Sequence, residues 1–192
     1  MSAAIDLPVA VFSCHRLIAR GPLGAVLEAV RTAAAGDPAP LVIDLATGRV
    51  VDLDERGSLD EARARLTPAP EAEKRGPGRP KLGVTAREVT LLPRHWDWLS
   101  AQPGGASVAL RKLVEAALRD AEGPDRARKA KEAAYRFMTA LAGDLPGYEE
   151  ATRMLFAGDW TAFDAATEGW PEGVRETAQE MAAGAWRNGA GS

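Results

Sequence analysis

The chain is short of the residues on which disulfides, metal sites and membrane spans depend. Its 192 residues include one cysteine, Cys14, and two histidines. A single cysteine cannot form an internal disulfide and is too few for a cysteine-based metal site. No stretch reaches the ~18 uncharged apolar residues of a membrane-spanning helix, and the start, MSAAIDLPVAVF, lacks the basic region of a secretory signal. We therefore expect a cytoplasmic protein with no membrane contact, no metal and no cofactor.

Groups that could carry catalysis are scarce as well. Cys14 and His15 are neighbours, but adjacent side chains on the strand expected here point to opposite faces and cannot form a nucleophile–base pair. A nucleophile, an oriented base and an oxyanion site are all needed, and the sequence shows no such trio. Asp44, Asp52 and Asp54 lie near an expected hairpin, and their spacing matches no cation-binding loop, so we expect surface carboxylates. The sequence thus predicts a protein that is not an enzyme.

The charge is unevenly distributed along the chain. The 46% of hydrophobic and 27% of charged residues are typical of a globular protein, and the net charge is −3. Residues 1–73 carry 7 basic and 11 acidic side chains, whereas residues 74–94 carry 6 basic and 1 acidic. Residues 95–192 are acidic again, with 11 basic and 15 acidic side chains. The basic block from 74 to 94 creates a local field that favours a polyanionic partner.

The first 66 residues contain the signals of a small β-α-β-β-α domain. The run of residues 9–14 is short, apolar and rich in β-branched types, which predicts a strand. Pro22 is placed to start a helix, because an apolar face follows it at three- and four-residue spacing: Leu23, Val26, Leu27 and Val30. Two apolar runs, 41–45 and 50–53, flank a turn with Gly48 and predict a hairpin. Ser58 and Glu61 form a capping box that opens a short helix to Leu66.

The remainder divides into a linker, a central unit and a helical end. Residues 67–84 hold four prolines and three glycines and predict a linker. Further helices are expected at 93–101, at 107–120 with Ser107 as its cap, and from Pro124 to Gly143, followed by three more at 148–157, 160–168 and 171–187. The expected fold class is α+β. Its parts are an N-terminal α+β domain at 1–66, the linker, a central unit at 85–122 and a C-terminal helical domain at 123–188.

The linker contains a short motif that points to DNA. The segment RGPGRPK at 75–81 resembles the AT-hook, a peptide whose Gly-Arg-Pro core lies in the minor groove of A/T-rich DNA. Glycine clears the groove walls, proline keeps the backbone extended, and arginine enters where the potential is most negative. Pro77 stands where the AT-hook has its first arginine, so the positions that carry over are Gly78, Arg79, Pro80 and Lys81. The alternative is a solvated Pro/Gly linker with incidental charges.

The central unit, 85–122, resembles the ribbon-helix-helix family of bacterial DNA-binding proteins. The resemblance rests on a short apolar strand, Pro93 at a helix start, Trp96 and Leu99 as core positions, and the turn Gly105-Ala106-Ser107 before a second helix. It implies that two chains pair their strands into a ribbon that enters the major groove. The amides of Ser107 and Val108 would then bind a phosphate. The stretch from Pro93 to Ser107 is about one helical turn shorter than in that family, and an ordinary helix-turn-helix built from 93–101 and 107–120 is the alternative.

The register of the ribbon stays open at this point. With Leu92 facing inward, Arg87, Val89 and Leu91 face DNA, whereas with Val89 and Leu91 inward, Glu88 and Thr90 do. Residues expected to contact DNA are Lys74, Arg75, Gly78, Arg79, Pro80, Lys81, Arg87, Thr90, Arg94, Ser107, Val108 and Arg111. Residues expected in the dimer core are Val89, Leu91, Leu92, Trp96, Leu99, Leu110, Leu113 and Val114.

The chain as a whole also resembles a bacterial family of unknown function, which implies a three-part bacterial protein. The sequence hypothesis is a homodimeric protein of the nucleoid, a transcription regulator or an architectural protein, with double-stranded DNA as its partner. One alternative is an interaction module whose C-terminal helices dock a protein, because residues 132–192 carry 4 basic and 10 acidic side chains. The other is a small-ligand sensor with its pocket in residues 1–66.

Overall fold

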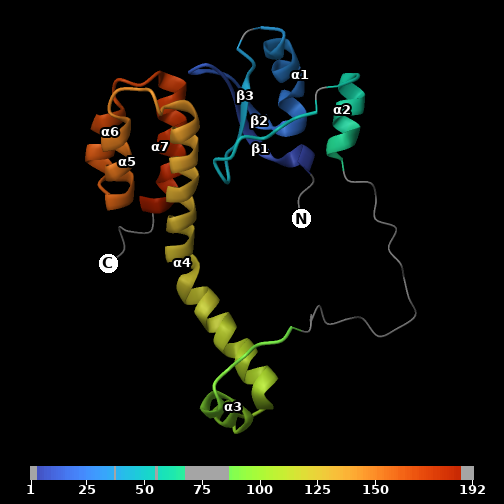
Figure 1. The fold of residues 1–192 in the computed structure, drawn as a ribbon, viewed down its shortest axis with the longest axis vertical. Helices are drawn as coiled ribbons and strands as arrows, with labels where there is room; N and C mark the ends of the chain where they lie inside the picture. The colour runs from blue at the N-terminus through green and yellow to red at the C-terminus, as the bar shows by residue number, and fades with distance from the viewer. Residues whose placement is uncertain (1–3, 37, 55, 68–86, 187–192) are drawn as a thin grey trace. The chain divides into compact units, whose positions relative to one another are not determined.

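The computed structural model describes residues 4–36, 38–54, 56–67 and 87–186. The chain divides into two compact units, which are treated separately below. The terminal unit combines residues 1–69 with 123–192, and the central unit comprises residues 70–122. Helix α4, Gly105–Leu141, contributes residues to both (Figure 1).

The terminal unit is built on a three-stranded antiparallel sheet with the order β2-β1-β3. The strands are β1 (Pro8–Ser13), β2 (Arg16–Pro22) and β3 (Leu41–Asp44), and a 3₁₀ turn at Ala4–Asp6 precedes them. The fold class is α+β, as predicted. The expected strand at 9–14 is present as β1, but β2 was not anticipated. The second arm of the predicted hairpin is reduced to one bridge between Ile43 and Val50.

Alternation along the strands sends apolar side chains to both faces of the sheet. Val9, Val11 and Val42 pack against the predicted apolar face of helix α1, Leu23–Ala34. Ala10, Phe12 and Ile43 point the other way, into a larger core formed with the end of α4 and with the C-terminal helices. Because side chains alternate in a strand, one sheet supplies both cores. The stretches expected as separate domains at 1–66 and 123–188 therefore share a core.

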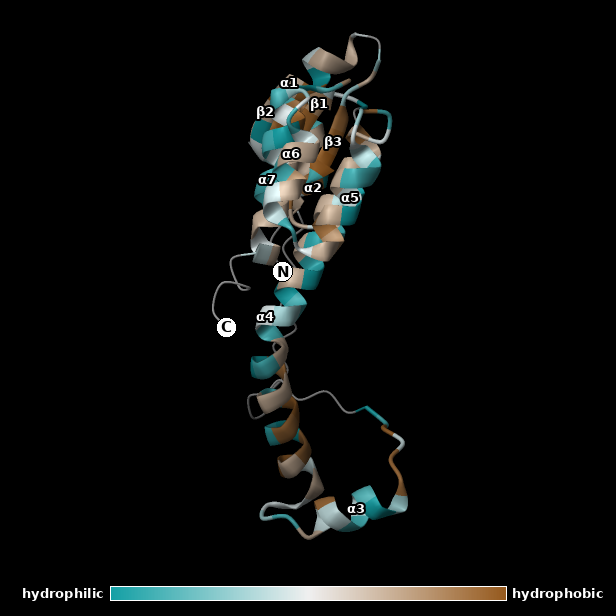
Figure 2. Ribbon diagram, turned by 90° about the vertical axis from the view of Figure 1, so that its left-hand side faces the viewer, coloured by the Kyte–Doolittle hydropathy of each residue, from teal (hydrophilic) through white to brown (hydrophobic). Residues whose placement is uncertain are grey.

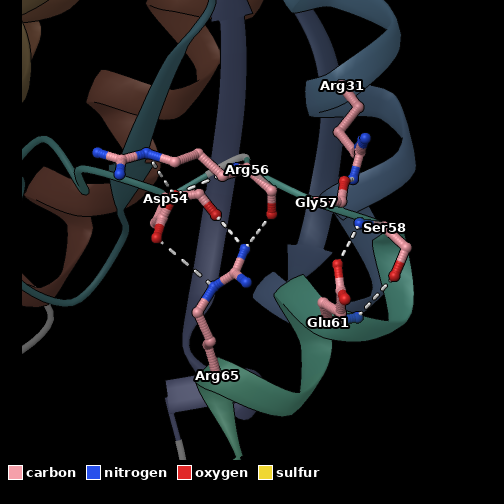
Figure 3. Close-up of polar contacts among 7 residues, drawn as sticks. All are labelled: Arg31, Asp54, Arg56, Gly57, Ser58, Glu61 and Arg65. Atoms are coloured by element: carbon pink, nitrogen blue, oxygen red, sulfur yellow. Dashed lines mark hydrogen bonds and ion pairs between the residues drawn. The ribbon is translucent and has the colours of Figure 1, made fainter.

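Helix α2, Leu59–Leu66, begins at the predicted capping box (Figure 3). The Ser58 hydroxyl accepts a hydrogen bond from the Glu61 amide at 3.2 Å, and the Ser58 amide donates to the Glu61 carboxylate at 2.7 Å. This reciprocal pair satisfies two amide groups that the first turn of a helix leaves without a partner. The backbone and hydroxyl hydrogen bonds from Ser58, in that order, lower the pKa of Glu61.

The C-terminal helices lie close to where the sequence places them. They are α5 (Tyr148–Ala157), α6 (Trp160–Thr167) and α7 (Glu172–Trp186). Gly158 ends α5 with φ at 78°, a conformation that glycine adopts without strain. The Asp159 carboxylate caps α6 by accepting from the Ala162 amide at 3.0 Å. The indole of Trp170 donates to the Pro146 carbonyl at 2.8 Å, fixing the loop before α5.

Helix α4 corrects two helix boundaries predicted from the sequence. It runs without interruption from Gly105 to Leu141, with Pro124 inside it, so Pro124 does not start a new helix. Proline removes one backbone donor, but the flanking residues are mostly Ala, Arg, Lys and Glu, which favour a helix. The helix also starts two residues before Ser107, at Gly105, and Gly104 and Gly105 have φ of +88° and +75°. Ser107 therefore lies in the first turn and is not the cap.

The central unit contains helix α3, Pro93–Ser100, and the first part of α4. Pro93 occupies the first turn of α3, as predicted. Residues 87–92 are assigned to no strand within the single chain. Of residues 87–122, only Leu99 and Ala109 are buried. The early turns of α4 are partly hydrophobic in Figure 2. Leu113, Val114 and Leu118 lie there and are exposed, so this unit leaves apolar side chains uncovered.

Candidate nucleic-acid interface

The start of α4 is the part of the central unit best suited to hold an anion. The first four amides of a helix have no partner within it, and here they belong to residues 104–107. The Gly105 amide bonds to the Gln102 carbonyl at 2.9 Å, which leaves the amides of Ala106 and Ser107 without a helical partner. A Cβ added to Gly105 would meet no atom within 4 Å apart from its chain neighbours and the backbone of its own helix. The positive end of the helix dipole also favours an anion here.

The position of Val108 follows from the same count. It is one residue beyond the four amides at the start of α4, so the expected pair Ser107 and Val108 becomes Ala106 and Ser107. Ser107 is exposed and its carbonyl accepts a hydrogen bond from Arg111 Nε at 3.2 Å, which places a guanidinium beside the first turn. Of the other expected DNA contacts, Arg87, Thr90 and Arg94 are exposed.

Most of the positive charge of the basic block lies outside the described residues. This applies to Lys74, Arg75, Gly78, Arg79, Pro80 and Lys81, and therefore to the whole AT-hook-like motif. The remaining stretch, 87–122, carries 5 basic and 5 acidic side chains. The excess of positive charge therefore belongs to the linker sequence.

Exposed apolar side chains lie on both sides of this helix start along the sequence. We define the central apolar surface as Val89, Leu92, Trp96, Leu113, Val114 and Leu118, all of which are exposed. Trp96, expected in a core, is 40% exposed in the single chain, whereas Leu99 is 3% exposed. Leu91 and Leu110 are half-buried. Monomeric proteins rarely expose so much apolar surface unless it binds a partner.

Leu118 belongs to this surface but was not among the expected dimer residues. It follows Val114 by four positions on α4 and is 63% exposed. Residues four apart lie on the same side of a helix, so the stripe of Leu110, Leu113 and Val114 continues through it. This four-residue spacing in the sequence could have identified Leu118 as a residue of the apolar stripe. Trp98 is exposed as well, but it lies two positions from Trp96, about 200° around the helix.

The terminal unit corrects the reasoning about Cys14 and His15. They form the turn between β1 and β2 and do not lie on a strand, and Cys14 has φ of 51°. His15 Nε2 lies 3.4 Å from Asp144 Oδ1. A cleft of about 580 Å³ is lined by residues 13–17 and by 171–173 and Glu176. Within the described residues no group of three or more His, Cys, Asp or Glu is placed to hold a metal ion.

Two of the three aspartates of the hairpin region have local partners. Asp44 is buried, contrary to expectation, because its carboxylate accepts from the Ala46 amide at 2.8 Å and the Thr47 hydroxyl at 2.5 Å and thereby closes the turn. Asp54 forms ion pairs with Arg56 and Arg65 at 3.5 and 3.7 Å (Figure 3). The carboxylates of Asp44 and Asp54 therefore serve local loop structure.

One hollow in the expected ligand-sensor region lies between α1 and α2. It is lined by residues of the first 66 alone, among them Leu27, Val30 and Leu53, and its volume is about 80 Å³. Binding pockets for small molecules are typically about 300–1,000 Å³. This hollow is therefore too small for most ligands of that class.

Comparison with known proteins places the chain in one family. Among the described residues, no helix is both long and apolar enough to cross a bilayer. No curated protein matches the chain, and no solved structure does. The model of the family described as "Uncharacterized protein conserved in bacteria (DUF2239)" matches residues 8–182, so the chain belongs to this bacterial family.

Proposed function

We propose that the chain is a homodimeric DNA-binding protein of the bacterial nucleoid that acts as a transcription regulator or as an architectural protein. One observation carries the proposal: the central unit leaves its apolar side chains exposed, and the first turn of α4 has amides at Ala106 and Ser107 without a helical partner. A unit in which only Leu99 and Ala109 are buried among residues 87–122 gains stability by covering its apolar surface with a partner. A second copy carries the same surface.

The ribbon-helix-helix resemblance supplies the arrangement of the dimer. Residues 87–92 of two chains would pair as antiparallel strands, and the central apolar surface would pack between the copies. Residues 87–92 form no strand within the single chain, so in this arrangement their partner would be the same segment of the other copy. The half-buried Leu91 and Leu110 would be covered further.

The DNA contacts would come from two places in each chain. The free amides of Ala106 and Ser107 bind a backbone phosphate, with Arg94 and Arg111 adding charge nearby. Arg79 and Lys81 of the AT-hook-like motif enter an adjacent A/T-rich minor groove, where the potential is most negative. Because the two contacts are tethered, the second becomes intramolecular and overall affinity rises.

The test is a titration of the full chain with A/T-rich and G/C-rich duplexes at about 50 and about 200 mM salt. Each neutralised phosphate lowers the logarithm of the binding constant by about 0.9 per decade of salt, so binding falls steeply across this range. We expect tighter binding to the A/T-rich duplex. No binding to either duplex in dilute buffer contradicts the proposal.

A second function is favoured by an aromatic surface on the terminal unit. Tyr135, Phe156 and Trp160 are exposed there, with ring centroids 5.6 Å apart for Tyr135 and Phe156. Aromatic side chains are enriched in protein interfaces, and residues 132–192 have the acidic excess noted above. The alternative is therefore a dimeric interaction module that binds a protein. A chain that forms dimers but ignores DNA supports this alternative.

A further inference from the structure

Helix α4 contains two adjacent residues that weaken a helix, Gly123 and Pro124. Proline has no backbone N–H, so the carbonyl of Asp120, four residues earlier, loses its partner within the helix. Glycine and proline are the least favourable residues inside a helix, and no other glycine or proline lies between Ala106 and Leu141. The pair is therefore the point at which the backbone of α4 is held least firmly.

Little side-chain packing supports the helix at this pair. A Cβ added to Gly123 would meet no atom within 4 Å apart from its chain neighbours and the backbone of its own helix, and Pro124 is exposed. Between Ala109 and Ala133 no residue of α4 is buried. Segments with few buried contacts open at low cost in free energy. A bend at the pair therefore displaces no buried side chain of this stretch.

The part of α4 that follows the pair is reinforced. Arg128 donates hydrogen bonds to the carboxylates of Asp125 and Glu132, at 3.2 and 2.9 Å, and so bridges two turns of the helix. Arg136 donates to the Thr47 carbonyl at 3.1 Å, which ties the helix to the turn after β3. This part of α4 is thus anchored in the terminal unit.

We propose that Gly123 and Pro124 form a hinge at which α4 bends, so that the central unit reorients relative to the terminal unit while both stay folded. The division between the two compact units falls between Glu122 and Gly123, at the pair itself. A bend there breaks few backbone hydrogen bonds, because proline has already removed one, and proline is a common cause of helix bending. The inference is independent of DNA binding. In the proposed dimer, the hinge gives each terminal unit its own orientation.

The experiment measures a distance within α4 across the pair. Lys112→Cys and Lys129→Cys, both at exposed positions, carry spin labels in a Cys14→Ser background. Labelled chains are diluted with unlabelled ones, so that only distances within one chain are recorded. A straight helix separates the two backbone positions by about 26 Å. We expect the distance distribution to be at least about twice as wide with the native pair as with Gly123→Ala and Pro124→Ala, which restore a donor and favour the helix.

Pro146→Ala removes a proline outside α4 and is the matched control, so its distribution should stay as wide as with the native pair. Thermal unfolding shows whether each variant is folded. Hydrogen exchange is the second measurement, and the amides of residues 119–123 should exchange faster in wild type than in the double variant. A narrow distribution near 26 Å with the native pair overturns the inference. Equal widths, or equal exchange, in wild type and the folded double variant also overturn it. DNA binding is tested separately, by the duplex titration.

Discussion

Phe12 of β1 and Phe137 of α4 lie with their ring centroids 5.6 Å apart, at the centre of the larger core. Both side chains are fully buried. The contact joins the N-terminal sheet to a helix more than a hundred residues later in the chain. The two ends of the sequence therefore depend on each other for their stability.

Phe137→Ala tests this dependence. Removing a buried phenylalanine costs about 3–5 kcal/mol of unfolding free energy through lost burial and a residual cavity. We expect both ends of the chain to lose stability together in a denaturant titration. Tyr135→Ala, on the exposed side of the same helix, is the control and should cost less. A variant in which only the helical end loses structure argues against a shared core.

The fold could be predicted where the signal is local. The apolar stripe of α1, the short β-branched run of β1 and the cap at Ser58 depend on residues close together in the sequence, and the structure confirms all three. β2 escaped prediction because Leu17, Ile18 and Ala19 are consecutive, without the alternation that marks a half-buried strand. The contact of Phe12 with Phe137 has no local pattern at all.

The candidate site was predictable in part for a related reason. Pro93 and the apolar positions of α4 follow from spacing, but the start of α4 depends on the backbone conformation of Gly104 and Gly105. Two adjacent glycines indicate a break without saying which residue begins the helix. For this reason the predicted free amides, at Ser107 and Val108, are one position later than the observed ones, at Ala106 and Ser107. Pro124 misled the prediction because proline usually marks a helix boundary, and here the helix continues past it.

The capping box at α2 predicts a stability that depends on acidity. Hydrogen bonds from Ser58 lower the pKa of Glu61 in the folded state, so the ionised form stabilises the fold. This contribution is complete above the unfolded value of about 4.3 and is lost as the pH falls through the lowered folded value. Glu61→Gln should therefore flatten the loss of stability below about pH 4.3, measured by thermal unfolding across pH. Loss at the same rate in both proteins contradicts the assignment.

Ser58→Ala tests the second hydrogen bond of the same capping box, from the Glu61 amide to the Ser58 hydroxyl. Removing a serine cap costs about 1 kcal/mol, and the change should be similar at neutral and mildly acidic pH because serine does not titrate there. Thr67→Ala, beyond the C-terminal end of α2, is a suitable control, since its hydroxyl only returns to the Arg63 carbonyl.

Leu118→Glu is the sharpest test of the central apolar surface. A charge at a residue that is 63% exposed in the single chain costs little in a monomer, but in a dimer interface it is buried without a partner. We expect wild type to sediment at twice the chain mass of 20.3 kDa and the variant at the single mass. Lys112→Glu, exposed on the polar side of α4, should remain dimeric. A wild-type monomer, or a dimeric Leu118→Glu, removes the dimer from the proposed function.

The linker arginine and lysine predict a measurable change in salt dependence. Arg79→Ala with Lys81→Ala removes two positive charges, so the salt slope of duplex binding should fall by about two, with the larger loss of affinity on A/T-rich DNA. Arg49→Ala with Arg153→Ala changes the net charge equally at exposed positions of the terminal unit and is the matched control. An equal effect of the two double variants means that net charge, and not the AT-hook-like motif, carries the contact.

Ser107→Asp separates phosphate binding from helix stability, because the two effects have opposite signs. An acidic residue in the first turn of α4 interacts favourably with the helix dipole, so thermal stability should stay the same or rise by about 0.3–1 kcal/mol. The same carboxylate repels a phosphate at the free amides of Ala106 and Ser107, so duplex affinity should fall about tenfold or more, as for the loss of a charged contact. Ser107→Ala keeps both amides and should bind nearly as wild type. If Ser107→Asp binds DNA unchanged while remaining folded, the start of α4 does not hold a phosphate.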